Sequence, residues 1–133
     1  MAPSHPAGPN QLKLFQQWME FSQWLMGQTQ RWPKNLRHSL THRVELLTLE
    51  ILEWITSAAY GHKRRQRLMD INDGLNRLRV LLRLAHEMQT ISHKHYAEVA
   101  KRLGLCGRLL GAWMQREGLQ RASAATALQG VEP

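Results

Sequence analysis

The sequence predicts an all-α protein, an antiparallel up-down-up-down four-helix bundle formed by residues 11–117. Three observations favour this fold: apolar residues recur three and four positions apart in four successive segments, strand-like alternation is not sustained anywhere, and the connections are short. The length of 133 residues and the 43% hydrophobic content fit one domain with a packed core. We expect residues 1–10 to be a disordered N-terminal tail and residues 118–133 a flexible C-terminal tail.

The first two predicted helices, at about residues 11–30 and 39–60, have apolar faces broader than one packing seam requires. The first carries two adjacent apolar stripes, which are Leu12, Phe15, Met19 and Met26 and then Leu14, Trp18, Phe21 and Leu25. The second carries one long stripe with flanking leucines and an isoleucine: Leu40, Val44, Leu47, Ile51, Trp54 and Ala58, widened by Leu46, Leu49, Leu52 and Ile55. Pro33 predicts a turn at Trp32 between the two helices, and Gly61 is placed as the C-terminal cap of the second. The excess apolar surface indicates a partner subunit.

The third and fourth predicted helices, at about residues 67–91 and 93–116, each have one apolar stripe. These stripes are Leu68, Ile71, Leu75, Leu78, Leu82 and Ala85 on the third helix, and Tyr96, Val99, Leu103, Cys106, Leu110 and Trp113 on the fourth. Ser92 is placed as the N-cap of the fourth helix.

A line of small residues also follows one face of the fourth predicted helix: Ala97, Ala100, Gly104, Gly107 and Gly111. Each glycine costs a helix about 1 kcal/mol relative to alanine. We therefore expect Gly104, Gly107 and Gly111, together with Trp113 on the neighbouring stripe, to admit close packing of another helix. The alternative is that the glycines only accommodate a bend.

The charge balance indicates a polyanionic partner. Eighteen Lys and Arg face ten Asp and Glu, which gives a formal net charge of +8. Nucleic acid is the leading candidate and an anionic membrane surface is the competing one. No apolar run approaches the roughly 20 residues needed to span a bilayer, and the start lacks the pattern of a signal peptide, so we expect a soluble cytoplasmic protein. A single cysteine, Cys106, excludes an internal disulfide.

Basic residues fall into three groups that are candidates for nucleic-acid binding. The first, in residues 31–43, includes Arg37 and Arg43, and the second is the connection at residues 62–67, with Lys63, Arg64, Arg65 and Arg67. The third consists of Arg79 and Arg83, which lie one turn apart on the third predicted helix and which we expect to lack a carboxylate partner one turn away. Guanidinium groups suit bidentate phosphate contacts. The alternative for each group is a solvated or salt-bridged helix surface.

Neither catalysis nor metal binding is predicted. The acidic residues are scattered at positions typical of surface salt bridges, with no positioned nucleophile or acid/base pair. His38 and His42 could share a helix face, but the spacing supplies no obvious third ligand. We expect no enzyme activity, no cofactor and no metal.

Several motifs together resemble the accessory variability determinant (Avd) proteins of diversity-generating retroelements, over about residues 12–116. In order they are Trp32-Pro33-Lys34 with Arg37, Arg43-Val44-Glu45, Ala58-Ala59-Tyr60, the segment from Asn76 to Arg83, and Gly107-Arg108-Leu109-Leu110-Gly111-Ala112-Trp113. The resemblance implies a four-helix bundle that assembles into a homopentameric barrel. It also implies a basic surface that binds the reverse transcriptase of the same element, its template-repeat RNA and the cDNA. In this role the chain would be a non-catalytic partner in mutagenic reverse transcription.

Two other functions remain open from the sequence. One is an oligomeric four-helix scaffold, like the related proteins encoded in ribosomal RNA intervening sequences, without a specific nucleic-acid partner. In that case the basic residues should be paired across helices. The other is a membrane-surface protein, which needs a helix with cleanly opposed basic and apolar faces.

Overall fold

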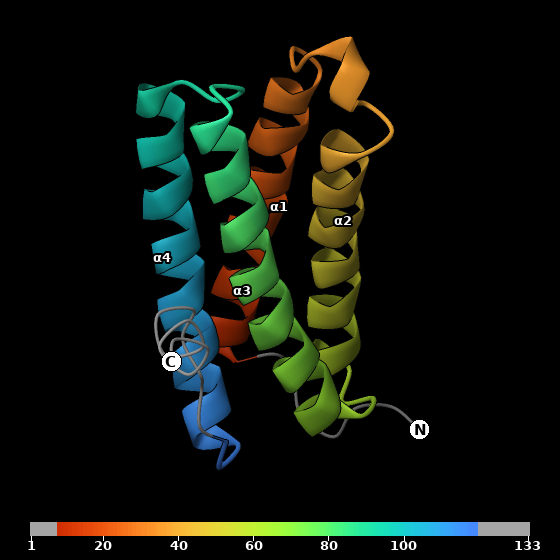
Figure 1. The fold of residues 1–133 in the computed structure, drawn as a ribbon. Coiled ribbons are helices and arrows are strands. Elements are labelled where there is room, and N and C mark those ends of the chain that lie inside the picture. The colour runs from red at the N-terminus through yellow and green to blue at the C-terminus, as the bar shows by residue number, and fades with distance from the viewer. Residues whose placement is uncertain (1–7, 120–133) are drawn as a thin grey trace, which may run out of the picture.

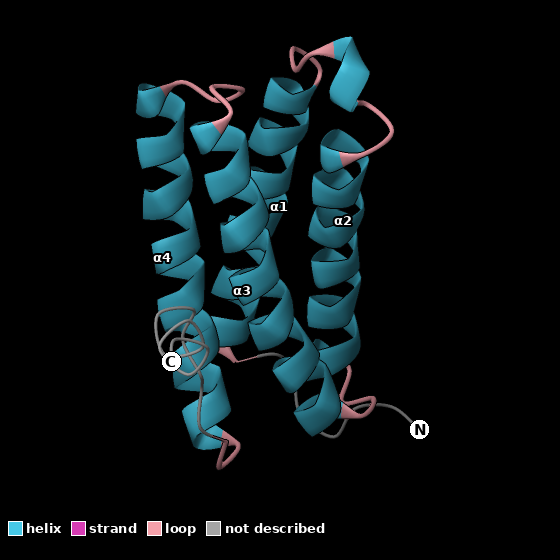
Figure 2. Ribbon diagram, viewed as in Figure 1, coloured by secondary structure: helices cyan, strands magenta, loops and turns pink. Residues whose placement is uncertain are grey.

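The computed structural model describes residues 8–119, which form four α-helices, one 3₁₀-helix and their connections (Figure 1, Figure 2). The α-helices are α1 (Pro9–Thr29), α2 (Leu40–Ala59), α3 (Arg64–Glu87) and α4 (His93–Arg116), and the 3₁₀-helix η1 (Lys34–Leu36) follows α1. The described residues contain no strand. The helices run alternately up and down, and α1 packs on α2, α2 on α3, α3 on α4 and α4 on α1. The predicted all-α four-helix bundle is confirmed for the single chain. Most of the two predicted tails, residues 1–7 and 120–133, lies outside the described residues.

Two predicted helix caps are confirmed by their geometry. Gly61 follows α2 with φ 81°, and its N–H donates to the carbonyl of Ala58 at 3.0 Å. The next N–H, that of His62, reaches back to the carbonyl of Ser57, which completes a Schellman motif. At the start of α4, the Ser92 hydroxyl accepts a hydrogen bond from the N–H of His95 at 3.1 Å. Both caps depend on local sequence alone, so they could be predicted.

Helix α3 begins three residues earlier and ends four residues earlier than the expected range of 67–91. Its N-cap, Lys63, has φ 50°, and beyond its C-terminus Gln89 has φ 61°. The N–H of Thr90 donates to the carbonyl of Ala85 at 2.8 Å, so α3 ends in a Schellman motif with glutamine where glycine is usual. A non-glycine residue in the left-handed region gives no signal in the sequence, which explains the misplaced end.

The core lies along the axis of the bundle and is built from the predicted stripes. On α1, the stripe of Leu14, Trp18, Phe21 and Leu25 is at most 1% exposed. The indole N–H of Trp18 donates to the carbonyl of Thr48 at 3.0 Å, which ties α1 to α2. Outside the core, Leu12, Leu46 and Leu49 are 51%, 44% and 47% exposed. The expected excess of apolar surface on the first two helices is therefore confirmed.

A tight glycine-mediated contact lies between α2 and α3, at a glycine that the sequence interpretation did not single out. A Cβ atom placed on Gly74 would lie 2.9 Å from Cγ1 of Ile51 and 3.0 Å from Cζ3 of Trp54. Carbon atoms not bonded to each other are in favourable contact at about 3.5–4.0 Å. Glycine at this position therefore lets the two helices approach closely.

Candidate nucleic-acid interface

Four cations lie exposed on and beside the connection from α1 to α2, within a segment that contains no Asp or Glu: Arg31, Lys34, Arg37 and Arg43. None of them forms an ion pair with another residue of the described range. We call residues 31–43 the basic segment. Trp32 and Leu40, which are 6% and 8% exposed, anchor the segment to the core while its cations face solvent. This arrangement is what a phosphate-binding surface requires, because the cations need not break contacts to bind.

The first carboxylate after the basic segment belongs to Glu45. It accepts a hydrogen bond from the Thr29 hydroxyl at 2.6 Å, across the ends of α1 and α2. The carboxylate is therefore held against α1 by this bond, and it forms no ion pair with the cations of the segment within the described residues.

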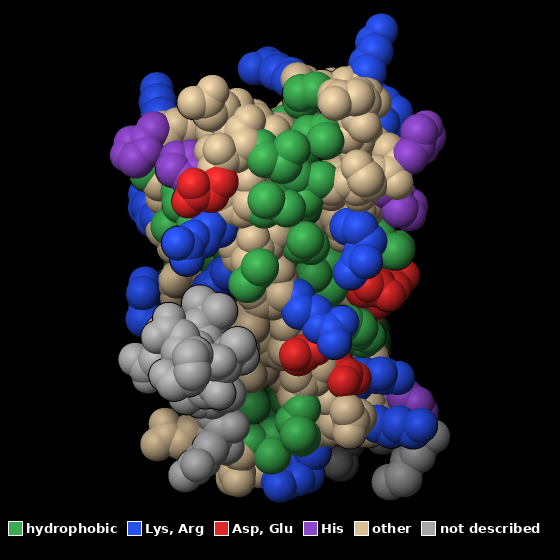
Figure 3. All heavy atoms as spheres, in the orientation of Figure 1, with side chains coloured by type: hydrophobic (Ala, Val, Ile, Leu, Met, Phe, Trp, Pro, Cys, Tyr) green, Lys and Arg blue, Asp and Glu red, His purple; other side chains and the backbone are tan. Residues whose placement is uncertain are grey.

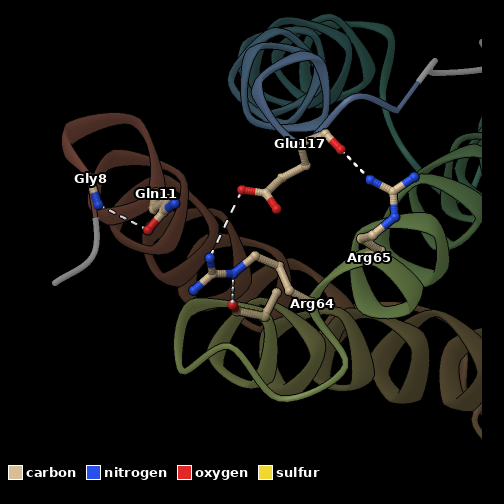
Figure 4. Close-up of polar contacts among 6 residues, drawn as sticks. Gly8, Gln11, Arg64, Arg65 and Glu117 are labelled. Atoms are coloured by element: carbon tan, nitrogen blue, oxygen red, sulfur yellow. Dashed lines mark hydrogen bonds and ion pairs between the residues drawn. The ribbon is translucent and has the colours of Figure 1, made fainter. Parts of the chain in front are cut away.

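The arginines between α2 and α3 make contacts within the chain (Figure 4). Nε of Arg64 donates to the carbonyl of Ala58 at 2.9 Å, and its Nη1 lies 3.9 Å from the carboxylate of Glu117. Arg65 donates to the backbone carbonyl of Glu117. Figure 4 shows the two guanidinium groups reaching toward the end of α4 from the start of α3. These residues therefore join three helices at one end of the bundle.

The two other candidate cations of this connection differ from each other. Arg67 is half-buried and pairs with Asp70 at 3.0 Å. Lys63 is exposed and takes part in none of the ion pairs among the described residues. A phosphate at this end would meet Lys63 first and would compete with existing partners for Arg64, Arg65 and Arg67.

The candidate arginines of α3 have different surroundings, although they are one turn apart. Arg79 is half-buried and donates to Oδ1 of Asn76 at 3.1 Å and to the carbonyl of Leu103, on α4, at 3.2 Å. Arg83 is 65% exposed, with Nε 3.9 Å from the carboxylate of Glu87. The expectation that Arg83 lacks an acid one turn away was wrong, because Glu87 stands four positions after it. A pair so exposed contributes little to stability and leaves Arg83 accessible.

The structure does not bring the three basic groups together. The basic segment and the 62–67 connection lie at opposite ends of α2, which has 20 residues and is therefore about 30 Å long. Figure 3 shows Lys and Arg side chains around the upper rim of the bundle and again near its lower end. A single chain thus offers two separate basic ends.

The predicted glycine line on α4 is only partly enclosed by the chain itself. Gly107 is buried and Trp113 is fully buried in the core, whereas Gly104 and Gly111 are half-buried. A Cβ atom placed on Gly104 would meet only Nη1 of Arg108, at 3.6 Å. No other described helix lies against Gly104. A close approach between helices inside the chain occurs at Gly74, and the role of the α4 line in packing stays a prediction.

Residues 8–119 contain no metal-binding cluster, that is, no group of three His, Cys, Asp or Glu residues suited to a metal ion. Burial raises the pKa of the Cys106 thiol to about 12, so it remains protonated and a poor nucleophile at neutral pH. None of the described helices is long and apolar enough to cross a membrane.

A protein-family model described as bAvd-like matches residues 12–117, which run from the first turns of α1 to the residue after α4. No curated protein and no solved structure matches the chain. The matched range contains the basic segment, the 62–67 connection, Arg79, Arg83 and the glycine line.

Proposed function

The chain belongs to the bAvd-like family, and on that premise we propose that it is a non-catalytic accessory protein of a diversity-generating retroelement. In this role it binds template RNA, the cDNA and the reverse transcriptase of the same element, and so supports mutagenic reverse transcription. The observation that carries the proposal is the basic segment, with its four exposed cations and no acidic residue. Phosphate contacts supply most of the sequence-independent affinity of such proteins for nucleic acid.

The surroundings of each cation rank the candidate residues by their expected contribution to nucleic-acid binding. Arg31, Lys34, Arg37 and Arg43 form the principal surface, because they are exposed and form no ion pair with described residues. Lys63 and Arg83 are accessible and extend the surface. Arg64, Arg65 and Arg79 already hold neighbouring helices together, and Arg67 already pairs with Asp70 within α3, so these four contribute less to binding.

We further propose that the protein works as a homo-oligomer, with five chains as the resemblance to Avd implies. Large apolar side chains that one chain leaves exposed support assembly: on α3, Val80, Leu84 and Met88 are 51%, 47% and 49% exposed. Figure 3 shows hydrophobic side chains gathered along the upper middle of the face on which α3 lies. The open side of Gly104 also leaves room for a neighbouring helix.

The nucleic-acid proposal is tested by binding of single-stranded RNA across a salt series. Arg37→Gln should lower the slope of log affinity against log salt by about 0.7 for each subunit engaged. Arg77→Gln is the matched control, since it removes the same charge from an exposed arginine that pairs with Asp73 at 2.9 Å. Equal effects of the two substitutions would mean that only net charge matters. If the wild-type chain does not bind RNA at low salt, the proposal fails.

Two further measurements test the partners. Light scattering on the full chain should give a pentamer, and a monomer at tens of micromolar would contradict the assembly. Co-purification with the reverse transcriptase encoded beside this gene should recover a stable complex. Assembly without binding to RNA or to the polymerase would instead indicate the scaffold function of the related intervening-sequence proteins.

A further inference from the structure

A cavity opens at the same end of the bundle as the basic segment. It has a volume of about 320 Å³ and lies between the end of α1, the connection from α3 to α4 and the first turns of α4. Arg31, the first cation of the basic segment, is one of its lining residues. Its volume is at the lower end of the range typical of small-ligand sites.

The walls of this cavity are aromatic and apolar. Trp24 is half-buried and Trp32 is 6% exposed, and they line the cavity with Leu25, Ile91 and Val99. The imidazole ring of His95 stands edge-on to Trp24, with 6.1 Å between ring centroids. Trp24 is the more accessible of the two tryptophans, and the Arg102 guanidinium lies over its ring, 5.4 Å from the centroid. An aromatic side chain at the edge of a basic surface is what single-stranded nucleic acids use for base stacking.

Charge distinguishes this cavity from another that borders α1 and α4. No Asp or Glu lines it, and the exposed Arg31 stands at its edge. The second cavity, lined by residues from Gln17 to Arg108, includes the carboxylates of Glu20 and Glu98. Of the two, only the cavity beside the basic segment can accept a group attached to a phosphate without meeting a carboxylate.

Gln89 adds a polar group to the lining at a conformational cost. Its φ of 61° lies in the left-handed region, where glycine would be unstrained and where glycine is the usual residue at a helix end. The exposed Gln89 side chain carries an amide donor and an acceptor on one planar group. Amides of this kind pair with the edges of nucleobases. Strain at a lining residue is typical of a functional position.

We propose that this cavity binds one unstacked nucleobase of a single-stranded nucleic acid. The base packs against Trp24, the amide of Gln89 contacts its edge, and the adjoining phosphate lies on Arg31. The proposal rests on the nucleic-acid function proposed above. It adds a base-binding position to a surface that otherwise contacts only the phosphate backbone of the nucleic acid.

The test compares a single-stranded oligouridylate of about ten nucleotides with an abasic oligomer of the same length, by fluorescence anisotropy on the full chain. Wild type should bind the base-bearing strand about 5- to 150-fold more tightly, the range that corresponds to one stacked base. Trp24→Leu should remove most of that preference and leave binding of the abasic strand unchanged. Trp54→Leu is the matched control, because Trp54 is another half-buried tryptophan and does not line the cavity.

Gln89→Gly gives a second test that does not depend on the packing of Trp24. Glycine suits the left-handed backbone, so the melting temperature should rise while the preference for the base-bearing strand falls several-fold. If Gln89 had only a structural role, its replacement would change the melting temperature without lowering the preference for the base-bearing strand. If Trp24→Leu loses its helical circular dichroism signal, the result with Gln89→Gly decides whether the cavity binds a base.

The outcomes separate this proposal from the one on which it rests. Equal, salt-dependent binding of both strands by wild type would overturn the base-binding position and leave the phosphate-binding surface in place. Absence of binding to either strand at low salt would overturn both. An unchanged preference in both Trp24→Leu and Gln89→Gly would show that any base contact lies elsewhere.

Discussion

Replacing Gly74 with alanine should destabilise the bundle, although alanine is the better helix former. The helix-propensity gain is about 1 kcal/mol. Against it, the added Cβ would lie 2.9 Å and 3.2 Å from two side-chain carbons of Ile51 and 3.0 Å from the ring of Trp54. Trp54 is half-buried and can shift outward. Ile51 is 0% exposed and cannot move without displacing other core side chains. Overpacking of this kind costs about 1–3 kcal/mol, and we expect the upper part of that range.

The expected net loss is therefore about 1–2 kcal/mol in the free energy of unfolding, or a fall of about 5–10 °C in Tm. Thermal melting followed by circular dichroism measures it. Gly27→Ala is the matched control, since a Cβ there would meet nothing within 4 Å and should raise Tm by a few degrees. In the double variant Ile51→Ala/Gly74→Ala the two effects should be non-additive, because alanine removes both Cγ1 and Cδ1 of Ile51 and so relieves the contact. A Gly74→Ala variant that melts at or above the wild-type temperature would refute the reasoning.

Four further predictions follow from single contacts. Gly61→Ala should cost about 1–2 kcal/mol in urea unfolding, because its φ of 81° is strained for alanine, and an unchanged midpoint would contradict the role of the cap. Cys106 should react with a thiol reagent at pH 8 only at the rate of unfolding, because burial raises its pKa to about 12, and a rapid reaction of the folded protein would show otherwise. The hydrogen bond from Arg102 holds the pKa of the Glu98 carboxyl below its ordinary value. The stabilising effect of the ionised Glu98 carboxylate is thus present at neutral pH and disappears as pH falls through that pKa. Glu98→Gln should therefore differ from wild type in Tm at neutral pH but not at a pH below that pKa. Gly104→Ala should leave the helical content intact but weaken assembly in light scattering, because inside the chain its Cβ meets only the end of Arg108.

Much of the fold could be predicted because its signals are local. The apolar stripes of α3 and the stripe from Leu14 to Leu25 on α1 are buried as their spacing indicated. The caps at Gly61 and Ser92 also formed as expected, since each depends on hydrogen bonds between residues at most five positions apart. The end of α3 was misplaced because Gln89 takes a conformation that its residue type does not favour.

The candidate site was less predictable. Sequence placed Arg79 and Arg83 in one group, but Arg79 bonds to a carbonyl of α4 and Arg83 stands in solvent beside Glu87. The carboxylate of Glu87 could have been found from its spacing. The contacts of Arg64 and Arg65 with Glu117 could not, because these residues are more than fifty positions apart.

By itself, then, the sequence determined that this chain forms four amphipathic helices with a surplus of positive charge, and its motifs indicated the family. Only the tertiary structure decided which cations remain accessible, that Gly74 lies at a close contact between helices, and that Trp24, Arg31 and Gln89 line one cavity. The physical reason is the range of the interactions. Helix periodicity and capping are set by residues within one or two turns, whereas burial, pairing of charges and the shape of a cavity depend on side chains that folding brings together from different helices.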